Sequence, residues 1–260
     1  LKAHTTLQVG GVADYFVTVQ NEDELREALV FAQKKKLSHV VFGEGSNILV
    51  GDAGYRGIII KNEIGGMTTK ETAESVLLVC GAGLLLDEVI ADMATKQYWG
   101  LETLSAIPGT VGATPIQNVG AYGVEVSQLI TTVTAIHSHT LEKKIFDTAA
   151  CAFTYRGSYF KTIAGTQWVV TTVTFCLSRS PDPKLSYGSL VGLESKATIS
   201  PQVIRDEVIA IRSTKFPDWK KVGTAGSFFK NPIIANEHYP PLQKKYPELP
   251  GYAAGNTPVS

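Results

Sequence analysis

An arginine and a serine, each set among aromatic residues, are the side chains of this 260-residue sequence best suited to chemistry. Arg156 lies in "TYRGSYFK" and Ser227 lies in "GTAGSFFKNP". Each segment alone is better explained by a surface arginine stacked on a ring, or by a serine that caps a turn. Both segments in one chain, together with two candidate anion sites, indicate an enzyme site that bridges domains.

Two glycine-rich segments are the candidate anion sites. One is "GEGSN" at residues 43–47, and the other is "IPGTVGATPIQNVGAYG" at residues 107–123, which has no charge in a chain that is 18% charged. Consecutive turns of small residues can aim backbone N–H groups at an anion, and glycine lets a phosphate come close. Two such loops could hold a diphosphate. For residues 43–47 a tight structural turn is an equal alternative, whereas the length of the second segment favours function.

Several other kinds of site lack support in the sequence. The phosphate-loop pattern is missing, and the G-x-G-x-x-G fingerprint fails because Ile48 stands at the third glycine position and Leu86 does so after "GAG" at residues 81–83. His137 and His139 would share one strand face, but no third metal ligand lies at a suitable spacing. No G-x-S-x-G pattern is present. We therefore expect no metal site and no Rossmann-type dinucleotide site.

The composition indicates which binding partners and which cellular compartment to expect. Lys+Arg and Asp+Glu number 24 each, which disfavours nucleic acid and membrane surfaces as partners. Cys80, Cys151 and Cys176 lie far apart in apolar runs, as expected of buried free thiols in a reducing compartment. No apolar run reaches the roughly 18 residues that a bilayer span needs. We expect a cytoplasmic monomer that acts on a small molecule.

The elements that must position these segments begin with a strand, a helix and a second strand. A helix is predicted over residues 21–37, where Asn21 and Glu24 stand in capping-box spacing before an apolar stripe. Residues 40–42 predict a short strand that ends at Gly43. The 43–47 segment is therefore expected to follow a strand directly.

From Gly57 onward the pattern favours β structure. Strands are expected within residues 57–64, 75–83, 130–140, 143–155 and 168–178, which are rich in β-branched residues. A helix over residues 85–96, with Gly100 as its stop, interrupts them, and another helix begins at Ser200-Pro201. The composition changes again after Asp218. We expect an α+β protein of two or three domains, not a doubly wound one.

The four segments, in this order, closely resemble the UDP-N-acetylenolpyruvoylglucosamine reductases, flavoenzymes of bacterial peptidoglycan synthesis and hence of cell wall growth, shape and division. The resemblance spans essentially the whole chain, and the subtype is the one with tyrosine before the catalytic arginine. It implies a vanillyl-alcohol-oxidase-type (PCMH-type) FAD-binding region in two parts, residues 1–62 and 63–214. It also implies a smaller, incomplete α+β substrate domain at residues 215–260.

The resemblance implies a reaction and roles for single residues. NADPH reduces FAD, and the enolpyruvyl ether of UDP-N-acetylglucosamine then takes a hydride from flavin N5 at C3 and a proton at C2, giving UDP-N-acetylmuramate. Arg156 would stabilise the enolate charge, and Ser227 would donate the proton. Substrate contacts would come from Tyr155, Tyr187, Lys215 and Asn231. FAD contacts would come from Gly43, Glu44, Gly45, Ser46, Asn47, Pro108, Gly109, Gly112, Ala113, Thr114, Gly120, Ala121 and Tyr122.

Two departures from the family pattern leave alternatives open. Gly157 stands where the family usually has an acidic residue, which would loosen the orientation of Arg156. The family's third catalytic residue, a glutamate in a later strand, has no counterpart, since Glu248 lies in a proline-rich turn. This implies a chain truncated within the third domain. The alternatives are another FAD-dependent oxidoreductase of the same fold, and a flavin-binding fragment without turnover.

Overall fold

The computed structural model describes residues 1–187, 189–196, 198–249 and 251. The chain divides into two compact units, Leu1–Ala225 and Gly226–Ser260. Residues 215–225 belong to the first unit, where Gln8 Nε2 donates to the Trp219 carbonyl at 2.9 Å and Thr224 N donates to the Thr6 carbonyl at 3.0 Å. The expected domain borders at residues 62 and 214 stay predictions.

The first sheet of this unit has three parallel strands in the order β1-β3-β2. They are β1 (Ala13–Val19), β2 (His39–Phe42) and β3 (Tyr55–Asn62), and helix α1 (Glu22–Lys35) connects β1 to β2. The predicted cap at Asn21 is confirmed, because its side chain accepts from Glu24 N at 2.9 Å, whereas the Glu24 carboxylate accepts from Gln20 N at 2.7 Å, one residue before the N–H that a capping box uses. The expected strand, helix and strand order is confirmed as well.

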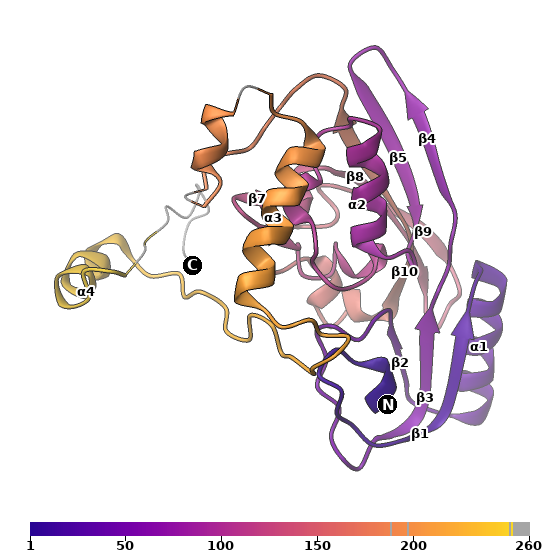
Figure 1. Ribbon diagram of the computed structural model, residues 1–260. Coiled ribbons are helices and arrows are strands. Elements are labelled where there is room, and N and C mark those ends of the chain that lie inside the picture. Colours follow the sequence, from indigo (N-terminus) through magenta and orange to yellow (C-terminus); the bar gives the residue numbers. More distant parts are fainter. Residues whose placement is uncertain (188, 197, 250, 252–260) are drawn as a thin grey trace. The chain divides into compact units, whose positions relative to one another are not determined.

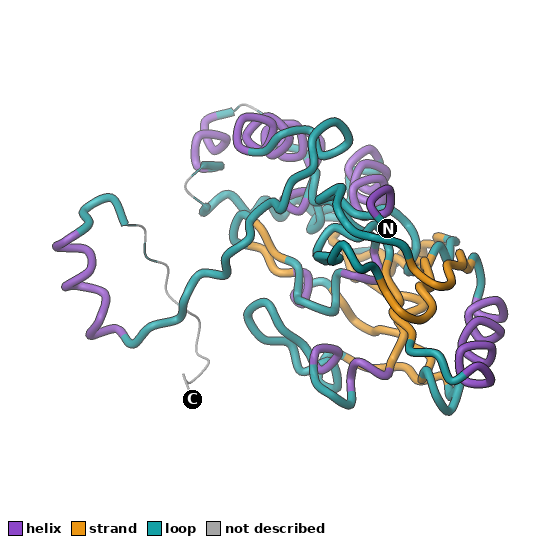
Figure 2. The backbone as a smooth tube through the Cα atoms, turned by 90° about the horizontal axis from the view of Figure 1, so that it is seen from below, coloured by secondary structure: helices purple, strands orange, loops and turns teal. Residues whose placement is uncertain are grey.

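Helix α1 fastens the two sheets of the unit to each other. Its buried residues Leu25 and Leu29 share one core with Ile60 of β3 and with Ile136 and Val169 of the second sheet. Figure 2 shows α1 alongside the strands at the outer side of this part of the fold. The position of β2, and of the 43–47 segment after it, is thereby set relative to the larger sheet.

The second sheet has five antiparallel strands in the order β4-β5-β10-β8-β9. Its strands are β4 (Met67–Glu71), β5 (Ser75–Gly81), β8 (Ile130–His137), β9 (Lys143–Asp147) and β10 (Trp168–Ser178). The strand expected over residues 143–155 ends early, at Asp147. There the Asp147 side chain accepts from Ala150 N at 2.7 Å and its carbonyl accepts from Cys151 N at 3.0 Å, which turns the chain out of the sheet.

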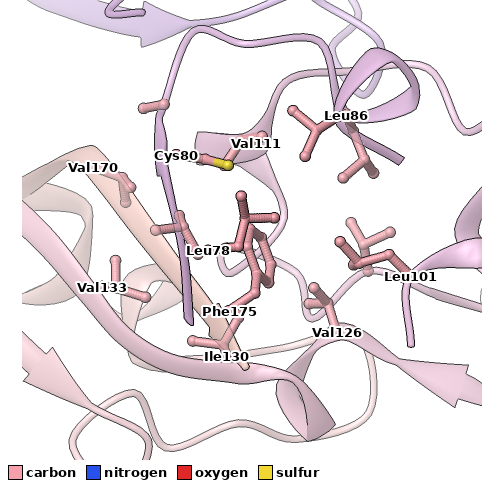
Figure 3. Packing of buried hydrophobic residues seen from close by; sticks show 14 of the residues in the cluster. Leu78, Cys80, Leu86, Leu101, Val111, Val126, Ile130, Val133, Val170 and Phe175 are labelled. Atoms are coloured by element: carbon pink, nitrogen blue, oxygen red, sulfur yellow. The ribbon is translucent and has the colours of Figure 1, made fainter. Parts of the chain in front are cut away.

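Helix α2 (Leu86–Thr95) covers one face of the five-stranded sheet, and a second helix packs on α2. Helix α2 buries Leu86, Val89, Ile90 and Met93 in the core that also contains Leu78 and Phe175 (Figure 3). Helix α3 (Pro201–Lys215) packs against α2 (Figure 1), and its N-cap Ser200 accepts from Val203 N at 3.3 Å, as expected.

The stop expected at Gly100 is wrong. Helix α2 ends at Thr95, and the residue in the left-handed region is Gln97, with φ 61°. Tyr98 N then donates back to the Met93 carbonyl at 3.0 Å, which closes the last turn. A glutamine can adopt this conformation here because its side chain donates to the Ala94 carbonyl at 3.1 Å.

The remaining regular elements are short. A two-stranded hairpin pairs β6 (Gly120–Ala121) with β7 (Val124–Glu125). The second unit carries helix α4 (Tyr239–Lys245). The 3-10 helices are Lys2–His4, Glu102–Leu104, Val111–Ala113, Val126–Gln128, Tyr159–Lys161, Gly165–Gln167, Val191–Ser195 and Asn236–His238. Among the described residues, none of the helices combines the length and the apolar character that a bilayer crossing requires.

The cysteines differ in their surroundings. Cys80 and Cys151 are buried, and burial raises the pKa of each thiol to about 12. Cys176 is only half-buried, although it lies in an apolar strand, because its side chain points to the face of β10 away from Phe175.

Buried and exposed side chains alternate along β5, and this predicts which substitutions there lower stability. Replacing Leu78, which is fully buried, with alanine should lower the free energy of unfolding by about 2–5 kcal/mol, because a cavity forms beneath α2. Val79→Ala is the matched control, since Val79 is 36% exposed on the other face and should cost about 1 kcal/mol or less. Urea unfolding of both variants measures the difference, and equal losses would contradict this placement of the core.

Candidate cofactor-binding site

The two glycine-rich segments, which we name the 43–47 loop and the 107–123 loop, touch each other. A Cβ placed on Gly43 would lie 2.2 Å from Thr110 Oγ1, and one on Gly109 would lie 3.0 Å from Ser46 Oγ. The Asn47 side chain donates to Gln117 Oε1 at 2.6 Å. The structure therefore brings together the two segments that the sequence indicated as anion sites.

Backbone N–H groups are concentrated where the loops meet. Those of Glu44 to Asn47, of Gly109 and Thr110, and of Ile116 to Asn118 donate to no acceptor among the described residues. Nearly all backbone N–H groups of a folded protein have a partner, in the protein or outside it. A set of such donors on two adjoining loops suits an anion with several oxygens, such as a diphosphate.

Contacts beneath the 43–47 loop determine which way its peptides face. Thr6 donates twice, from its N to the Gly45 carbonyl at 3.3 Å and from Oγ1 to the Ser46 carbonyl at 3.5 Å. A trans peptide is planar, so the N–H groups of Ser46 and Asn47 point away from Thr6. Gly45 has φ 62°, and a Cβ there would lie 2.2 Å from the His4 carbonyl. Only glycine fits this position without displacing the N-terminal segment.

The 107–123 loop is fixed from below in the same way. Leu86 N, at the start of α2, donates to the Gly109 carbonyl at 3.1 Å, so the N–H of Thr110 points to the opposite side. Val111 N and Gly112 N donate to the carbonyls of Leu84 and Ala82, each at 2.8 Å. The Gly109 carbonyl and the N–H groups of Val111 and Gly112 thus face the protein, and the N–H of Thr110 faces outward.

The end of the 107–123 loop is a hairpin with a tight turn. Tyr122 and Gly123 both have positive φ, 50° and 82°, as a two-residue turn of type I′ between β6 and β7 requires. Tyr187, an expected substrate contact, lies edge-on to the Tyr122 ring with centroids 5.5 Å apart. One expected substrate residue and one expected FAD residue are therefore in contact.

Arg156 is attached to the same loop. It has φ 56° in a two-residue turn closed by reciprocal Thr154–Gly157 backbone bonds of 3.0 and 3.1 Å. Its guanidinium donates to the Gly120 carbonyl at 2.7 Å and to the Asn118 carbonyl at 3.4 Å. These two carbonyl oxygens orient the guanidinium, although Gly157 supplies no acidic side chain.

Asn118 and Ser158 also contribute to the site, although no pattern in the sequence indicates them. Asn118 is 1% exposed, and its side chain donates to the Thr154 carbonyl at 3.0 Å and to Glu125 Oε2 at 2.8 Å. Ser158 Oγ donates to the Ile116 carbonyl at 2.8 Å. Together they join the Arg156 turn to the loop. An asparagine amid glycines signals a left-handed position, and Asn118 has φ 46°, but its partners are distant in the sequence.

The other expected site residues divide between the two units. Tyr155 lies under the Arg156 guanidinium, 5.4 Å from ring centroid to Cζ, and Lys215 is exposed at the last position of α3. Ser227 and Asn231 are exposed residues of the second unit. Their roles therefore rest on the sequence motif alone.

One charged group borders the 43–47 loop. Glu44 lies 3.8 Å from Lys61 Nζ, which also pairs with Glu63 at 2.8 Å. The hydrogen bond that Lys61 donates to Glu63 raises the pKa of Lys61, and Glu44 adds to the effect against the penalty of burial. Lys61 thus balances the only acidic side chain of the loop.

Comparison with known proteins defines the class. The model of an FAD-binding domain family matches residues 13–139, which include both loops. A solvent-stable cholesterol oxidase has the same fold, with a TM-score of 0.52 at 11% identity over 67% of this chain and 36% of that one. The predicted FAD-binding fold of the vanillyl-alcohol-oxidase type is confirmed, and the chain is a flavoprotein of this class.

Closer relatives define the family. UDP-N-acetylenolpyruvoylglucosamine reductase of Porphyromonas gingivalis strain W83 is 42% identical over 81% of this chain and 63% of its own length, and that of Cupriavidus pinatubonensis is 39% identical over 97% and 75%. The reductase (MurB) from Thermus caldophilus has a TM-score of 0.67 at 28% identity, over 89% and 73%. The chain belongs to the UDP-N-acetylenolpyruvoylglucosamine reductase family. It spans less than two thirds of the P. gingivalis relative.

The packing of the 43–47 loop predicts that Gly45→Ala lowers both the stability of the chain and its affinity for FAD. A side chain at φ 62° costs roughly 1–2 kcal/mol, and it also meets the His4 carbonyl, so stability and FAD affinity should both fall. Gly51→Ala is the matched control, because a Cβ there meets no atom within 4 Å and should change stability by less than about 0.5 kcal/mol. Thermal unfolding and FAD titration measure both, and a Gly45→Ala chain equal to the control would refute this packing.

Proposed function

We propose that this chain is an FAD-dependent, NADPH-consuming reductase that converts UDP-N-acetylglucosamine enolpyruvate to UDP-N-acetylmuramate in peptidoglycan synthesis. The observation that carries the proposal is the set of outward-facing N–H groups on two adjoining loops, with Arg156 tied to one of them. Family membership supports the substrate. We further propose a cytoplasmic monomer without a nucleic-acid or membrane partner.

The FAD would be held by the two loops. Outward N–H groups of the 43–47 loop and of Gly109 and Thr110 suit its diphosphate, because neutral donors can bind the anion without a lysine. We assign the other contacts to Pro108, Gly112, Ala113, Thr114, Gly120, Ala121 and Tyr122. When bound, FAD supplies the hydride for the enolpyruvyl double bond.

Arg156 would stabilise the negative charge that develops on the substrate. A guanidinium has five N–H donors in a planar fork, and two contacts go to the Gly120 and Asn118 carbonyls. The remaining donors can meet the carboxylate and the enolate oxygen. The half-buried position strengthens this interaction, because water screens it less than at the surface.

Ser227 would supply the proton at C2. An enolate carbon is a strong base, so a hydroxyl within hydrogen-bond reach can serve as the acid. We assign the substrate domain to residues 215–260, of which residues 215–225 pack within the first unit, and we expect Lys215 and Asn231 to contribute to binding of the UDP group. Tyr155 and Tyr187 would contact the sugar nucleotide from the first unit, where they adjoin Arg156 and Tyr122.

Half-reaction kinetics test the role of Arg156. In the FAD-loaded chain, Arg156→Ala should slow flavin reoxidation by the enolpyruvyl substrate by roughly 100-fold or more, since loss of one charge-stabilising donor group costs this much in comparable sites. Flavin reduction by NADPH should change only a few-fold. Arg179→Ala is the control, because Arg179 is 41% exposed and pairs with Glu71. Anaerobic stopped-flow absorbance follows both half-reactions.

Ser227→Ala should show the same selectivity. Equal slowing of reduction and reoxidation in either variant would contradict the assigned roles. An unmodified chain whose flavin is reduced by NADPH but not reoxidised by the enolpyruvyl substrate would exclude the reductase and favour a flavin-binding protein without turnover.

A further inference from the structure

Arg212, near the end of α3, touches both ends of the 107–123 loop. Its Nε donates to the carbonyl of Ala106, the residue just before the loop, at 3.2 Å. The Tyr122 side chain, at the hairpin turn, packs with Ile211 of α3 against the same small core, and it raises the pKa of Arg212 against the effect of burial. The ring of Phe216 covers it, with Cζ 5.1 Å from the centroid. One side chain thus spans two points that are sixteen residues apart in the sequence.

The same site fixes Ala106 from its other side. Ala106 has φ 58°, which is uncommon for a residue with a side chain, and its N–H donates to Asp87 Oδ1 at 2.6 Å. Asp87 is held by both guanidinium nitrogens of Arg205, with Nη2 2.9 Å from Oδ2. Burial opposes ionisation of Asp87, but the bonds from Arg205 and Ala106 outweigh it and lower its pKa. Asp87 and Arg212 therefore hold the N–H and the C=O of one residue.

The partners of Arg212 distinguish it from the other α3 arginine. Arg205 is paired with a carboxylate, whereas Arg212 forms no ion pair with a carboxylate among the described residues. A half-buried guanidinium that donates to a carbonyl loses hydration, and burial lowers the pKa of Arg212 although Tyr122 and the charge of Asp87 oppose this. The planar guanidinium of Arg212 can contact two chain segments at once and hold them at a fixed distance. A lysine ammonium lacks this planar set of donors and cannot do the same.

We propose that Arg212 is a positioning residue for the FAD site, which holds Ala106 and Tyr122 so that the N–H groups of Gly109 and Thr110 stay aimed outward. The inference rests on the proposed function. It gives α3 a role in the cofactor site, since the helix that ends in Lys215 also fixes the loop. Arg212 acts through the loop, and no contact of its own with the cofactor is needed.

Coupling between two substitutions tests the inference. Arg212→Lys keeps the charge but loses the fork, so the dissociation constant of FAD should rise roughly 10-fold or more, as measured by flavin fluorescence. Tyr122→Phe keeps the ring and removes the hydroxyl, and should weaken binding less. The double variant should bind FAD about as well as Arg212→Lys alone, because both changes break one shared contact. Arg56→Lys is the control, since Arg56 is 68% exposed in an ion pair with Asp14.

A second measurement does not depend on the cofactor. In the chain without FAD, Arg212→Lys should speed amide hydrogen exchange in peptides that cover residues 106–122, and Arg56→Lys should not. Unchanged exchange there overturns the inference whether or not FAD binds. Full FAD affinity in Arg212→Lys, or independent effects of the two substitutions, would also overturn it. Absence of FAD binding in the unmodified chain would instead refute the proposed function.

Discussion

The site depends on one contact, the packing of the 43–47 loop against the 107–123 loop. Each loop uses its carbonyl oxygens on the protein side, at Thr6 for one and at the start of α2 for the other. Planar trans peptides then direct the intervening N–H groups outward. Because Gly43 leaves no space beside Thr110, the two sets of donors come together. The geometry of the backbone alone therefore creates a site for an anion, and no lysine is needed.

The rest of the first unit holds this contact in place. Helix α1 joins the small sheet, which carries the 43–47 loop, to the large sheet, which supports the 107–123 loop through β5 and α2. Arg156 comes from a separate turn, yet its guanidinium donates to the Gly120 carbonyl. The 107–123 loop therefore positions both the proposed cofactor contacts and the positive charge of Arg156. A substitution that displaces the 107–123 loop should therefore weaken the binding of both the cofactor and the substrate.

Much of this arrangement could be predicted from the sequence where the signals are local. The cap at Asn21, the helix start at Ser200 and the strand over residues 168–178 depend on neighbours in the chain, and all are confirmed. The glycine-rich segments were identified as a pair because their lack of charge and their length are unusual. Their mutual contact and FAD-binding fold are confirmed; their ligand contacts stay predictions.

What the sequence did not reveal depends on distant partners. Gln97, not Gly100, ends the turn after α2, because its own side chain and a backbone bond to Met93 stabilise a left-handed residue. Asn118 and Arg212 appear ordinary in the sequence, and their importance follows from acceptors 36 and 106 residues away. No periodicity or spacing encodes such contacts.

Amide chemical shifts during titration with FAD show directly whether the two loops bind the diphosphate. If the outward N–H groups bind the diphosphate, the largest shifts should fall on Glu44 to Asn47 and on Gly109 and Thr110, with matching protection from hydrogen exchange. Gly51, in the same connection but outside the contact, should shift little. FAD binding that leaves these amides unshifted would contradict binding of the diphosphate by the two loops.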